Sequence, residues 1–511
     1  MKTLIWGTGR RAVHYVKIGG FSGNEIVGFV DSFPRNELFM GYKVYRPEDV
    51  SQLDYDYLVV SVKKDCSTIL KTCVAEKFDL NKIFFASEEQ DLDGEEEKIK
   101  KLLSLEEIRN IFPIMYRDII GKKENQIYYC SQLISEKLED HAIIKNYGDS
   151  QVIAWIPIEL LFSAKKCPEE FYGKLELQEQ TREHCPIIAF EIYRNLYQFF
   201  MQGKSYPDKY CQWYQNSYMS EGMYLGLTDE QVIGKRFREF EYMQRKLNKG
   251  MEFFVEHPAV AEWNTKGYFT LTEGHHEVCF LYLSGRTRMP VQITQKDYNA
   301  WCNTDVAEEV HRIILDQNRT EFYQPILNPY FSILHPFREG YTKSRLHHLL
   351  EYFGDRRFTD KKIVDIGANL GYMGQAFRRM GAEVTLFEFD PYHYELLEKI
   401  DKLLYTDCRI VKQKFEEYDS NEKYDVAILL TVFHHYFSDN EVRDRFIRKL
   451  NECIKQMLIW ESGDFPEEER NYILQHTKFH NYQHICYTYA TGKFRELGLY
   501  MIDDSEYLHK Q

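Results

Sequence analysis

One stretch, residues 362–391, constrains the fold of this chain most: KIVDIGANLGYMGQAFRRMGAEVTLFEFDP. Its first residues are β-branched and apolar, which is typical of a buried parallel strand. The chain then turns through glycines and continues as a helix of about three turns, which Gly381 ends in the usual C-terminal position. Residues 384–387 are strand-like again. The stretch therefore predicts a strand, a loop, a helix and a second strand of an α/β sheet.

The loop between the first strand and the helix has the residue types of a ligand-binding turn. Gly367 and Gly371 allow a tight turn and a close approach of the backbone to a ligand. Asn369 tolerates a left-handed backbone better than most residues do. Glu388 follows the second strand, about 20 positions past the loop, where an acid accepts hydrogen bonds from ribose hydroxyls. This combination is typical of a site for NAD or for S-adenosylmethionine.

The strands that follow distinguish between these two ligands. Residues 424–431 (YDVAILLT) predict a buried fourth strand that runs into VFHHY, and residues 457–464 (MLIWESGD) predict a fifth strand. With these motifs, the segment from about residue 353 to the C-terminus resembles a class I S-adenosylmethionine-dependent methyltransferase. The family's adenine-contacting acid is absent, because residues 411–415 (VKQKF) take its place. The resemblance implies S-adenosylmethionine as cofactor, with the binding residues Asp365, Gly367, Asn369, Gly371, Glu388 and Thr431.

Three side chains after the fourth and fifth strands are candidates for a catalytic base. If the methyl acceptor is a hydroxyl group, a base takes its proton during or soon after the transfer. His434 and His435 follow the fourth strand at its carboxyl end, where open α/β sheets bind ligands, and an unperturbed histidine pKa suits a base at neutral pH. Glu461 ends the fifth strand and competes with them, although a glutamate needs burial to raise its pKa toward 7. A purely positional mechanism is the alternative.

The first 90 residues predict a separate Rossmann-like domain. A strand is followed by GTGRRA, a GxGxxA turn with Gly7 and Gly9, and the next strand ends at Asp31. Taken alone, this is a dinucleotide-binding fingerprint. The sequences GFVD, GYKVY and YLVVSV resemble the N-terminal Rossmann-like domain of bacterial sugar-modifying acyltransferases, and a similar module accompanies some sugar methyltransferases. Three interpretations stay open: redox chemistry with NAD, a sugar-nucleotide or anion site, and a scaffold.

Residues 211–302 resemble the ParB/sulfiredoxin-like α+β fold. The resemblance lies in the turn TEGHHE, the helix after it and the strand sequence MPVQI. Glu273 and Glu277 replace the family's aspartate and arginine, and a glutamate inverts the charge that binds phosphate. We therefore expect no nucleotide hydrolysis at this turn. His275 and His276 are interpreted as structural histidines, because no second ligand pair has a metal-binding spacing, and no metal is expected.

Two further segments are interpreted as helical connectors: residues 91–210, which are rich in aromatic side chains, and residues 303–352. A charged run over residues 87–101 predicts a solvated linker helix, and a short strand is expected before Pro258. Residues of the second connector often fold over the cofactor or acceptor in the methyltransferase family. The candidate pocket residues there are Tyr341, Lys343 and Arg345.

Composition limits the partners and the compartment. The length of 511 residues suggests three or four domains. The formal net charge of −14, without a long basic run, disfavours nucleic acid as a partner. The 11 cysteines are scattered and form no CxxC pair, which indicates a reducing cytoplasm rather than a disulfide framework or zinc site. No signal peptide and no membrane span are expected.

These features predict an α/β multidomain protein. Its parts are a Rossmann-like domain over residues 1–90, an α+β middle domain over 211–302 and a Rossmann-like class I methyltransferase domain over 353–511. We expect a cytoplasmic methyltransferase that acts on a sugar, a nucleotide sugar or a surface-glycan precursor in polysaccharide biosynthesis. The alternatives are a non-catalytic nucleotide-binding or assembly protein and an NAD-dependent oxidoreductase that uses the N-terminal domain. The sequence predicts neither the acceptor atom nor the oligomeric state.

Overall fold

The computed structural model divides the chain into two compact units, which are described separately. The first comprises residues 1–127 and 489–494, and the second comprises the rest. The residues that the structure describes are 2–9, 12, 13, 16, 25–32, 34, 36–61, 66–88, 99–104, 138, 140, 142–148, 150–163, 185–220, 226–316, 322–332, 344–354, 358–490 and 493–502.

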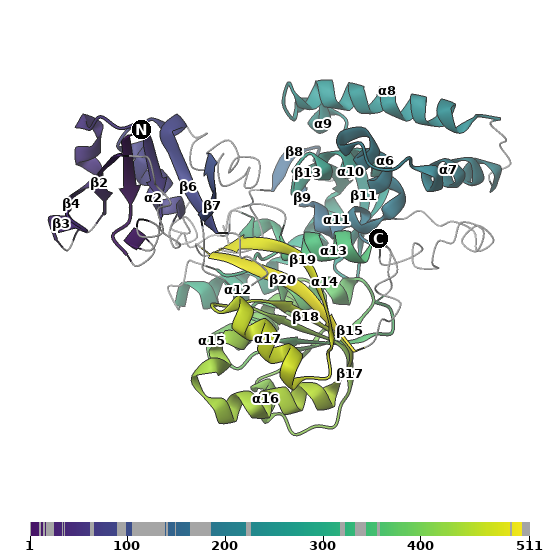
Figure 1. The fold of residues 1–511 in the computed structure, drawn as a ribbon. Helices are drawn as coiled ribbons and strands as arrows, with labels where there is room; N and C mark the ends of the chain where they lie inside the picture. Colours follow the sequence, from purple (N-terminus) through teal and green to yellow (C-terminus); the bar gives the residue numbers. More distant parts are fainter. Residues whose placement is uncertain are drawn as a thin grey trace. The chain divides into compact units, whose positions relative to one another are not determined.

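The first unit contains a seven-stranded sheet with the order β3-β4-β2-β1-β5-β6-β7 (Figure 1). The five strands from β4 to β6 are parallel, and β3 and β7 are antiparallel edge strands. Successive residues Leu4 and Ile5 belong to two different core clusters, so both faces of β1 are buried, as in a Rossmann-like sheet. The elements are β1 (Lys2–Trp6), β2 (Glu25–Val30), β3 (Leu38–Phe39), β4 (Tyr42–Tyr45), η1 (Pro47–Gln52), β5 (Tyr57–Val60), α2 (Cys66–Ala75), η2 (Leu80–Lys82), β6 (Ile83–Glu88) and β7 (Ile99–Ser104).

The second unit begins with a mixed α+β part, here named the middle module (described residues within 142–332). Its six-stranded sheet has the order β10-β12-β11-β13-β9-β8. The strands are β8 (Ile143–Asn146), β9 (Gln151–Pro157), β10 (Leu161–Ser163), β11 (Ala259–Asn264), β12 (Tyr268–Glu273) and β13 (Arg288–Thr294). The helices are η4 (Ile158–Leu160), η6 (Ile187–Ala189), α6 (Glu191–Gln202), α7 (Asp208–Ser220), α8 (Asp229–Leu247), α9 (Glu252–Glu256), α10 (His275–Leu283), α11 (Gln295–Cys302), α12 (Thr304–Asp316) and η7 (Pro329–Phe331).

These elements differ from the expected connectors. Residues 143–163, expected to be helical, form three strands of the middle sheet, so this sheet draws on a longer segment than 211–302. Part of the expected charged linker helix is likewise extended, because β7 pairs antiparallel with β6. The strand expected before Pro258 is the short helix α9. Residues 105–137, the greater part of the first connector before β8, lie outside the described residues. The resemblance to the ParB/sulfiredoxin-like fold stays a prediction.

The second unit ends with a doubly wound sheet, here named the C-terminal module (described residues within 344–502). The strand order is β16-β15-β14-β17-β18-β20-β19, and β20 is antiparallel to β18. The elements are α13 (Arg345–Phe353), β14 (Lys362–Ile366), α14 (Tyr372–Arg379), β15 (Glu383–Phe387), α15 (Pro391–Leu403), β16 (Arg409–Val411), η8 (Phe415–Glu417), β17 (Tyr424–Leu430), η9 (Phe433–Ser438), α16 (Asn440–Cys453), β18 (Ile454–Glu461), α17 (Pro466–His476), β19 (Asn481–Ala490) and β20 (Lys493–Met501).

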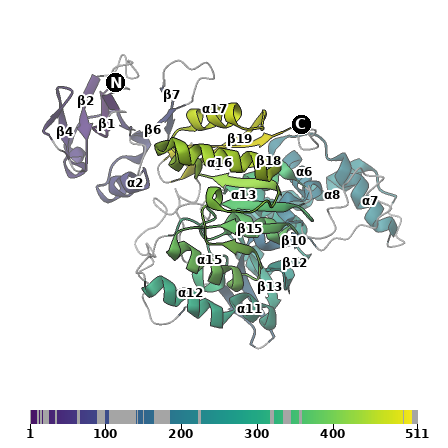
Figure 2. The same cartoon turned by 90° about the horizontal axis from the view of Figure 1, so that it is seen from below.

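Both faces of this sheet are covered by helices. Figure 2 shows α16 and α17 on one side of the sheet and α15 on the other. Neighbouring residues of β14 point to opposite faces: Val364 packs in one core cluster with Phe446 of α16, and Ile363 packs in another with Phe377 of α14. This arrangement confirms the predicted Rossmann-like fold of the C-terminal region.

The middle and C-terminal modules share one hydrophobic core, since the cluster that contains Ile363 continues to Phe269 and Phe280 of the middle module. Polar contacts also join them. Arg379 Nε donates to the Gly267 carbonyl at 2.9 Å, and Asn303 Nδ2 donates to the Leu403 carbonyl at 3.2 Å. Lys399 forms an ion pair with Glu309. Since the core is continuous, the two modules form one compact unit.

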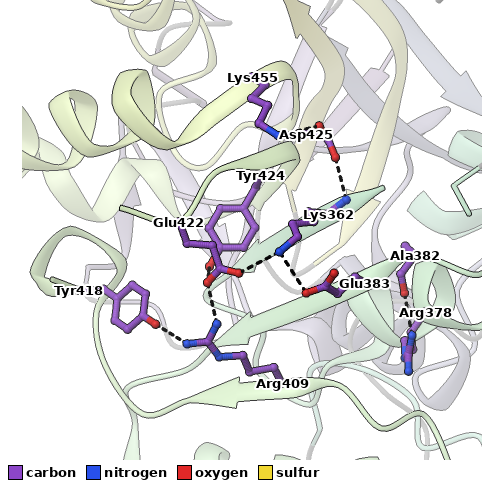
Figure 3. A network of polar contacts seen from close by, with 10 residues as sticks. All are labelled: Lys362, Arg378, Ala382, Glu383, Arg409, Tyr418, Glu422, Tyr424, Asp425 and Lys455. Atoms are coloured by element: carbon purple, nitrogen blue, oxygen red, sulfur yellow. Dashed lines mark hydrogen bonds and ion pairs between the residues drawn. The ribbon is translucent and has the colours of Figure 1, made fainter. Parts of the chain in front are cut away.

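Charged side chains gather at the amino ends of the parallel strands in the C-terminal module (Figure 3). Lys362 Nζ lies 3.3 Å from Glu383 Oε1 and 3.5 Å from Glu422 Oε1. Arg409 Nη1 lies 2.6 Å from Glu422 Oε2. In each pair a positive charge lies beside a negative one, and the pairs link neighbouring strands at their partly exposed amino ends. This edge lies opposite the one where such sheets bind ligands.

The helices within the described residues include none with the length and apolar character of a membrane span.

Candidate active site

The glycine loop after β14 needs its small residues for both conformation and space. Gly367, Asn369 and Gly371 have φ angles of 73°, 53° and 81°, in the left-handed region. A Cβ at Gly367 would lie 2.8 Å from Cγ2 of Val432. A Cβ at Gly371 would lie 2.6 Å from Cδ1 of Leu397. The loop therefore has the sharp turn that the sequence predicts.

Two buried carboxylates hold this loop. Asp365 Oδ2 accepts a hydrogen bond from the Gly374 N–H at 3.0 Å. Glu388 accepts from the Asn369 N–H at 2.8 Å and from the Asp390 N–H at 2.9 Å. Burial raises the pKa of Asp365 to about 7 and also raises the pKa of Glu388. Glu388 thus connects the glycine loop to the end of β15.

A buried ion pair lies at the carboxyl ends of β17 and β18. Glu461 Oε2 lies 3.0 Å from Arg345 Nη1 and accepts a hydrogen bond from Thr431 Oγ1 at 2.6 Å, while Thr488 Oγ1 donates to Oε1. Thr431 has a φ of 62°, which is strained for a β-branched residue, and its N–H also donates to the Glu461 carbonyl at 3.0 Å. The sequence singled out Arg345, Thr431 and Glu461 separately, but gave no signal that they meet. Tyr341 and Lys343 lie outside the described residues.

The two histidines after β17 lie on η9 with their ring centroids 3.9 Å apart. His435 is exposed and His434 is half-buried. The His434 ring packs on Gly463, which follows β18, so closely that a Cβ at Gly463 would overlap Nδ1. Glu469 Oε1 holds the Gly463 N–H at 2.9 Å. Sequence analysis missed Gly463 and Glu469, although Gly463 was part of the motif that predicted the fifth strand.

The histidine turn of the middle module is a closed aromatic cluster. Nδ1 of His276 lies 3.1 Å from the Tyr197 hydroxyl, and Nε2 lies 3.2 Å from the Tyr210 hydroxyl. Burial raises the pKa of the neighbouring Glu277 carboxyl. Both ring nitrogens of His276, which is half-buried, therefore have tyrosine partners within the middle module. In the first unit, Thr8 Oγ1 of the Gly7–Gly9 turn donates to Asp31 Oδ2.

Comparisons with known proteins address the C-terminal module directly. A family model described as a methyltransferase domain matches residues 337–492. The C-terminal region is a methyltransferase domain. A second family model, described as C2185-like, N-terminal, matches residues 1–84. No curated protein matches the chain in sequence.

Solved structures resemble parts of the chain at low identity. The bifunctional kinase-methyltransferase WbdD has 19% identity, 38% coverage of this chain, 46% coverage of that chain and a TM-score of 0.32. The chain thus covers about half of the WbdD chain. A second structure is magnesium protoporphyrin IX methyltransferase (ChlM) from Synechocystis PCC 6803 with bound SAM. It is 15% identical, and the match covers 41% of this chain and 83% of that chain with a TM-score of 0.25.

Residues of the methyltransferase domain fit a nucleoside-containing cofactor. The side-chain Oδ1 of Asn369 is buried in the glycine loop and has no hydrogen-bond partner among the described residues. A buried amide oxygen without a partner is costly, and a ligand with donor groups satisfies it.

Proposed function

We propose that the protein transfers a methyl group from S-adenosylmethionine to a hydroxyl of a sugar, a nucleotide sugar or a related glycan precursor. The assignment of the cofactor rests on the left-handed loop with Gly367 and Gly371, which Glu388 holds and which contains the buried Oδ1 of Asn369. The sugar class rests on the resemblance of the first domain to those of sugar-modifying enzymes. The acidic net charge of −14 supports a small acceptor over a nucleic acid.

The chain's own residues have distinct roles in binding. Glu388 accepts hydrogen bonds from the ribose hydroxyls, while its backbone partners at Asn369 and Asp390 keep the carboxylate oriented. Phe389 is 57% exposed directly after this acid, and Lys414 Nζ lies 5.3 Å from its ring centroid. We assign adenine stacking to Phe389, which compensates for the missing adenine-contacting acid. When bound, S-adenosylmethionine supplies an electrophilic methyl group on its sulfonium.

His434 is the base that we favour. Nδ1 of His434 is buried against Gly463. We therefore assign proton transfer to Nε2, the other nitrogen of the ring. Nε2 of His434 would take the proton of the acceptor hydroxyl as that oxygen becomes methylated. Glu461 is less suited to this role, because protonation would break its buried pair with Arg345.

Calorimetry of the full-length protein tests the cofactor, with S-adenosylmethionine and NAD titrated in parallel. Binding of the first and not the second supports the methyltransferase, whereas NAD binding alone supports the redox alternative. Incubation with a panel of nucleotide sugars and other glycan precursors, followed by mass spectrometry, identifies the acceptor by a gain of about 14 daltons, one CH₂. Failure to bind either cofactor would favour a non-catalytic role.

A further inference from the structure

The helix that follows the glycine loop has no N-cap side chain of its own. The N-cap of α14 is Gly371, which has no side chain to cap the helix, and within the C-terminal module Asp365 Oδ2 accepts only from the Gly374 N–H of the first turn among the described contacts. The first N–H groups of a helix have no partner within the helix and need an acceptor. The N–H of Tyr372, the first residue of α14, donates at 3.2 Å to Oε1 of Gln324. Gln324 is buried and belongs to the segment of the middle module after α12.

The side chain of Tyr372 is held by the middle module as well. Its hydroxyl donates at 3.2 Å to Oε1 of Glu159, which lies on η4 at the end of β9. The Glu159 side chain is 9% exposed, and its other oxygen lies 3.8 Å from Nε2 of His347. On the other side of the imidazole, Nδ1 of His347 meets the Ser344 hydroxyl at 2.8 Å. Ser344 caps α13 and lies 3.5 Å from the Tyr372 hydroxyl, so the four side chains close a ring.

These contacts converge on one residue, which directly follows the loop. Gly371 cannot move without Tyr372, its neighbour in the chain. Movement of Tyr372 would break two hydrogen bonds, one from its main-chain N–H to Gln324 and one from its hydroxyl to Glu159. Both acceptors are buried carbonyl or carboxylate oxygens, so water does not replace them readily. The backbone of the loop is therefore fixed by partners that are 48 and 213 residues away in the sequence.

We propose that Gln324 and Glu159 are positioning residues for the cofactor loop, so that the middle module completes the S-adenosylmethionine site. This inference rests on the proposed function of the loop as the cofactor site. The middle module then has a role in cofactor affinity that does not require a ligand of its own. Both residues contact Tyr372, which directly follows the loop, so the expected effect is on cofactor binding before it is on the chemical step.

Substitutions at Gln324 separate positioning from packing. Gln324→Leu keeps a similar volume and removes the acceptor, whereas Gln324→Glu keeps an acceptor oxygen at a helix N-terminus, where a negative charge is favourable. We expect the dissociation constant for S-adenosylmethionine to rise about 10-fold in Gln324→Leu, as for the loss of one buried hydrogen bond, and about 3-fold or less in Gln324→Glu. Tyr372→Phe, which removes only the hydroxyl, should also weaken binding and provides a second variant if Gln324→Leu does not fold.

Glu309→Gln is the matched control, because Glu309 pairs with Lys399 across the same two modules but does not contact the loop. Calorimetry with S-adenosylmethionine gives the affinity, and thermal unfolding without ligand gives the stability. Weaker binding in Gln324→Leu and Tyr372→Phe, with normal binding in Gln324→Glu and Glu309→Gln, supports the proposal. Wild-type affinity in both test variants overturns it, as does an equal loss in Glu309→Gln. If the unmodified protein does not bind the cofactor, the proposed function fails instead.

Discussion

Gly463 lies directly against the imidazole of His434, and no space for a side chain remains between them. The two residues come from different strand ends, β17 and β18, and their contact sets the position of the histidine ring. A methyl group at position 463 must therefore displace the ring or the loop that carries it.

Gly463→Ala is expected to lower methyl transfer about 100-fold, because a displaced base loses the alignment with its acceptor. Affinity for S-adenosylmethionine should stay near that of the unmodified protein. The measurement is turnover together with calorimetric affinity. Gly234→Ala on α8 is the matched control, since its Cβ has ordinary space. Normal turnover in Gly463→Ala would show that the position of His434 is not important for the reaction.

Gly367→Val should abolish measurable binding of S-adenosylmethionine. The φ of 73° strains any residue with a Cβ, and the added atoms meet Val432. Calorimetry checks the binding, and circular dichroism checks that the variant is folded. A folded variant with wild-type affinity would rule out the loop as the cofactor site.

Replacement of the three candidate bases should give three different results. His434→Ala should lower turnover by about 10²–10⁴-fold with nearly unchanged cofactor affinity. His435→Ala should retain most activity, because its side chain is exposed. Glu461→Gln should reduce the free energy of unfolding by about 3–5 kcal/mol, since the buried Arg345 loses its carboxylate. If both histidine variants keep normal turnover, the base is Glu461 or the mechanism is purely positional.

The stability of the protein should depend on pH through Glu469. Burial raises the pKa of this carboxyl to about 7 in the folded state, from its ordinary value of 4.5. At a pH between these two pKa values, Glu469 keeps its proton in the folded protein and has lost it in the unfolded chain. The contribution of Glu469 to stability therefore falls as the pH rises through this range. Glu469→Gln should therefore gain stability relative to the unmodified protein between pH 5 and pH 8, by about 2–3 kcal/mol. Urea unfolding at the two pH values measures the difference, and a constant difference contradicts the prediction.

The middle module should not hydrolyse nucleoside triphosphates. In the ParB/sulfiredoxin-like interpretation, which stays a prediction, Glu277 takes the place of a phosphate-binding arginine. The ring nitrogens of His276 lie within hydrogen-bond distance of Tyr197 and Tyr210. Phosphate release from ATP or CTP should stay at the background rate. Hydrolysis that is present in the unmodified protein and lost in His276→Ala would contradict this expectation.

The parts of the site that are local in sequence could be predicted. The loop with Gly367 and Gly371 and the acid Glu388 lie within one strand–helix–strand unit, so their spacing fixes their geometry. The pair of Arg345 and Glu461 is 116 residues apart and depends on how α13 packs on the sheet, which no periodicity records. The contact of Tyr372 with Glu159, across 213 residues, was missed for the same reason. The middle sheet was underestimated because β8 and β10 are too short to give a clear alternating pattern, and because β9 is buried at most positions and does not alternate.

The shared core of the middle and C-terminal modules has a consequence for how this protein can change. The carbonyl of Leu404 lies where a side chain at position 267 would begin, and Phe280 and Ile363 belong to the same apolar cluster. A methyltransferase domain from another protein, grafted onto this middle module, would not fit that surface unless both sides were altered together. A change in acceptor specificity therefore requires fewer substitutions when they lie near the carboxyl ends of the strands of the C-terminal module. Exchange of the whole domain would require changes throughout the shared core as well.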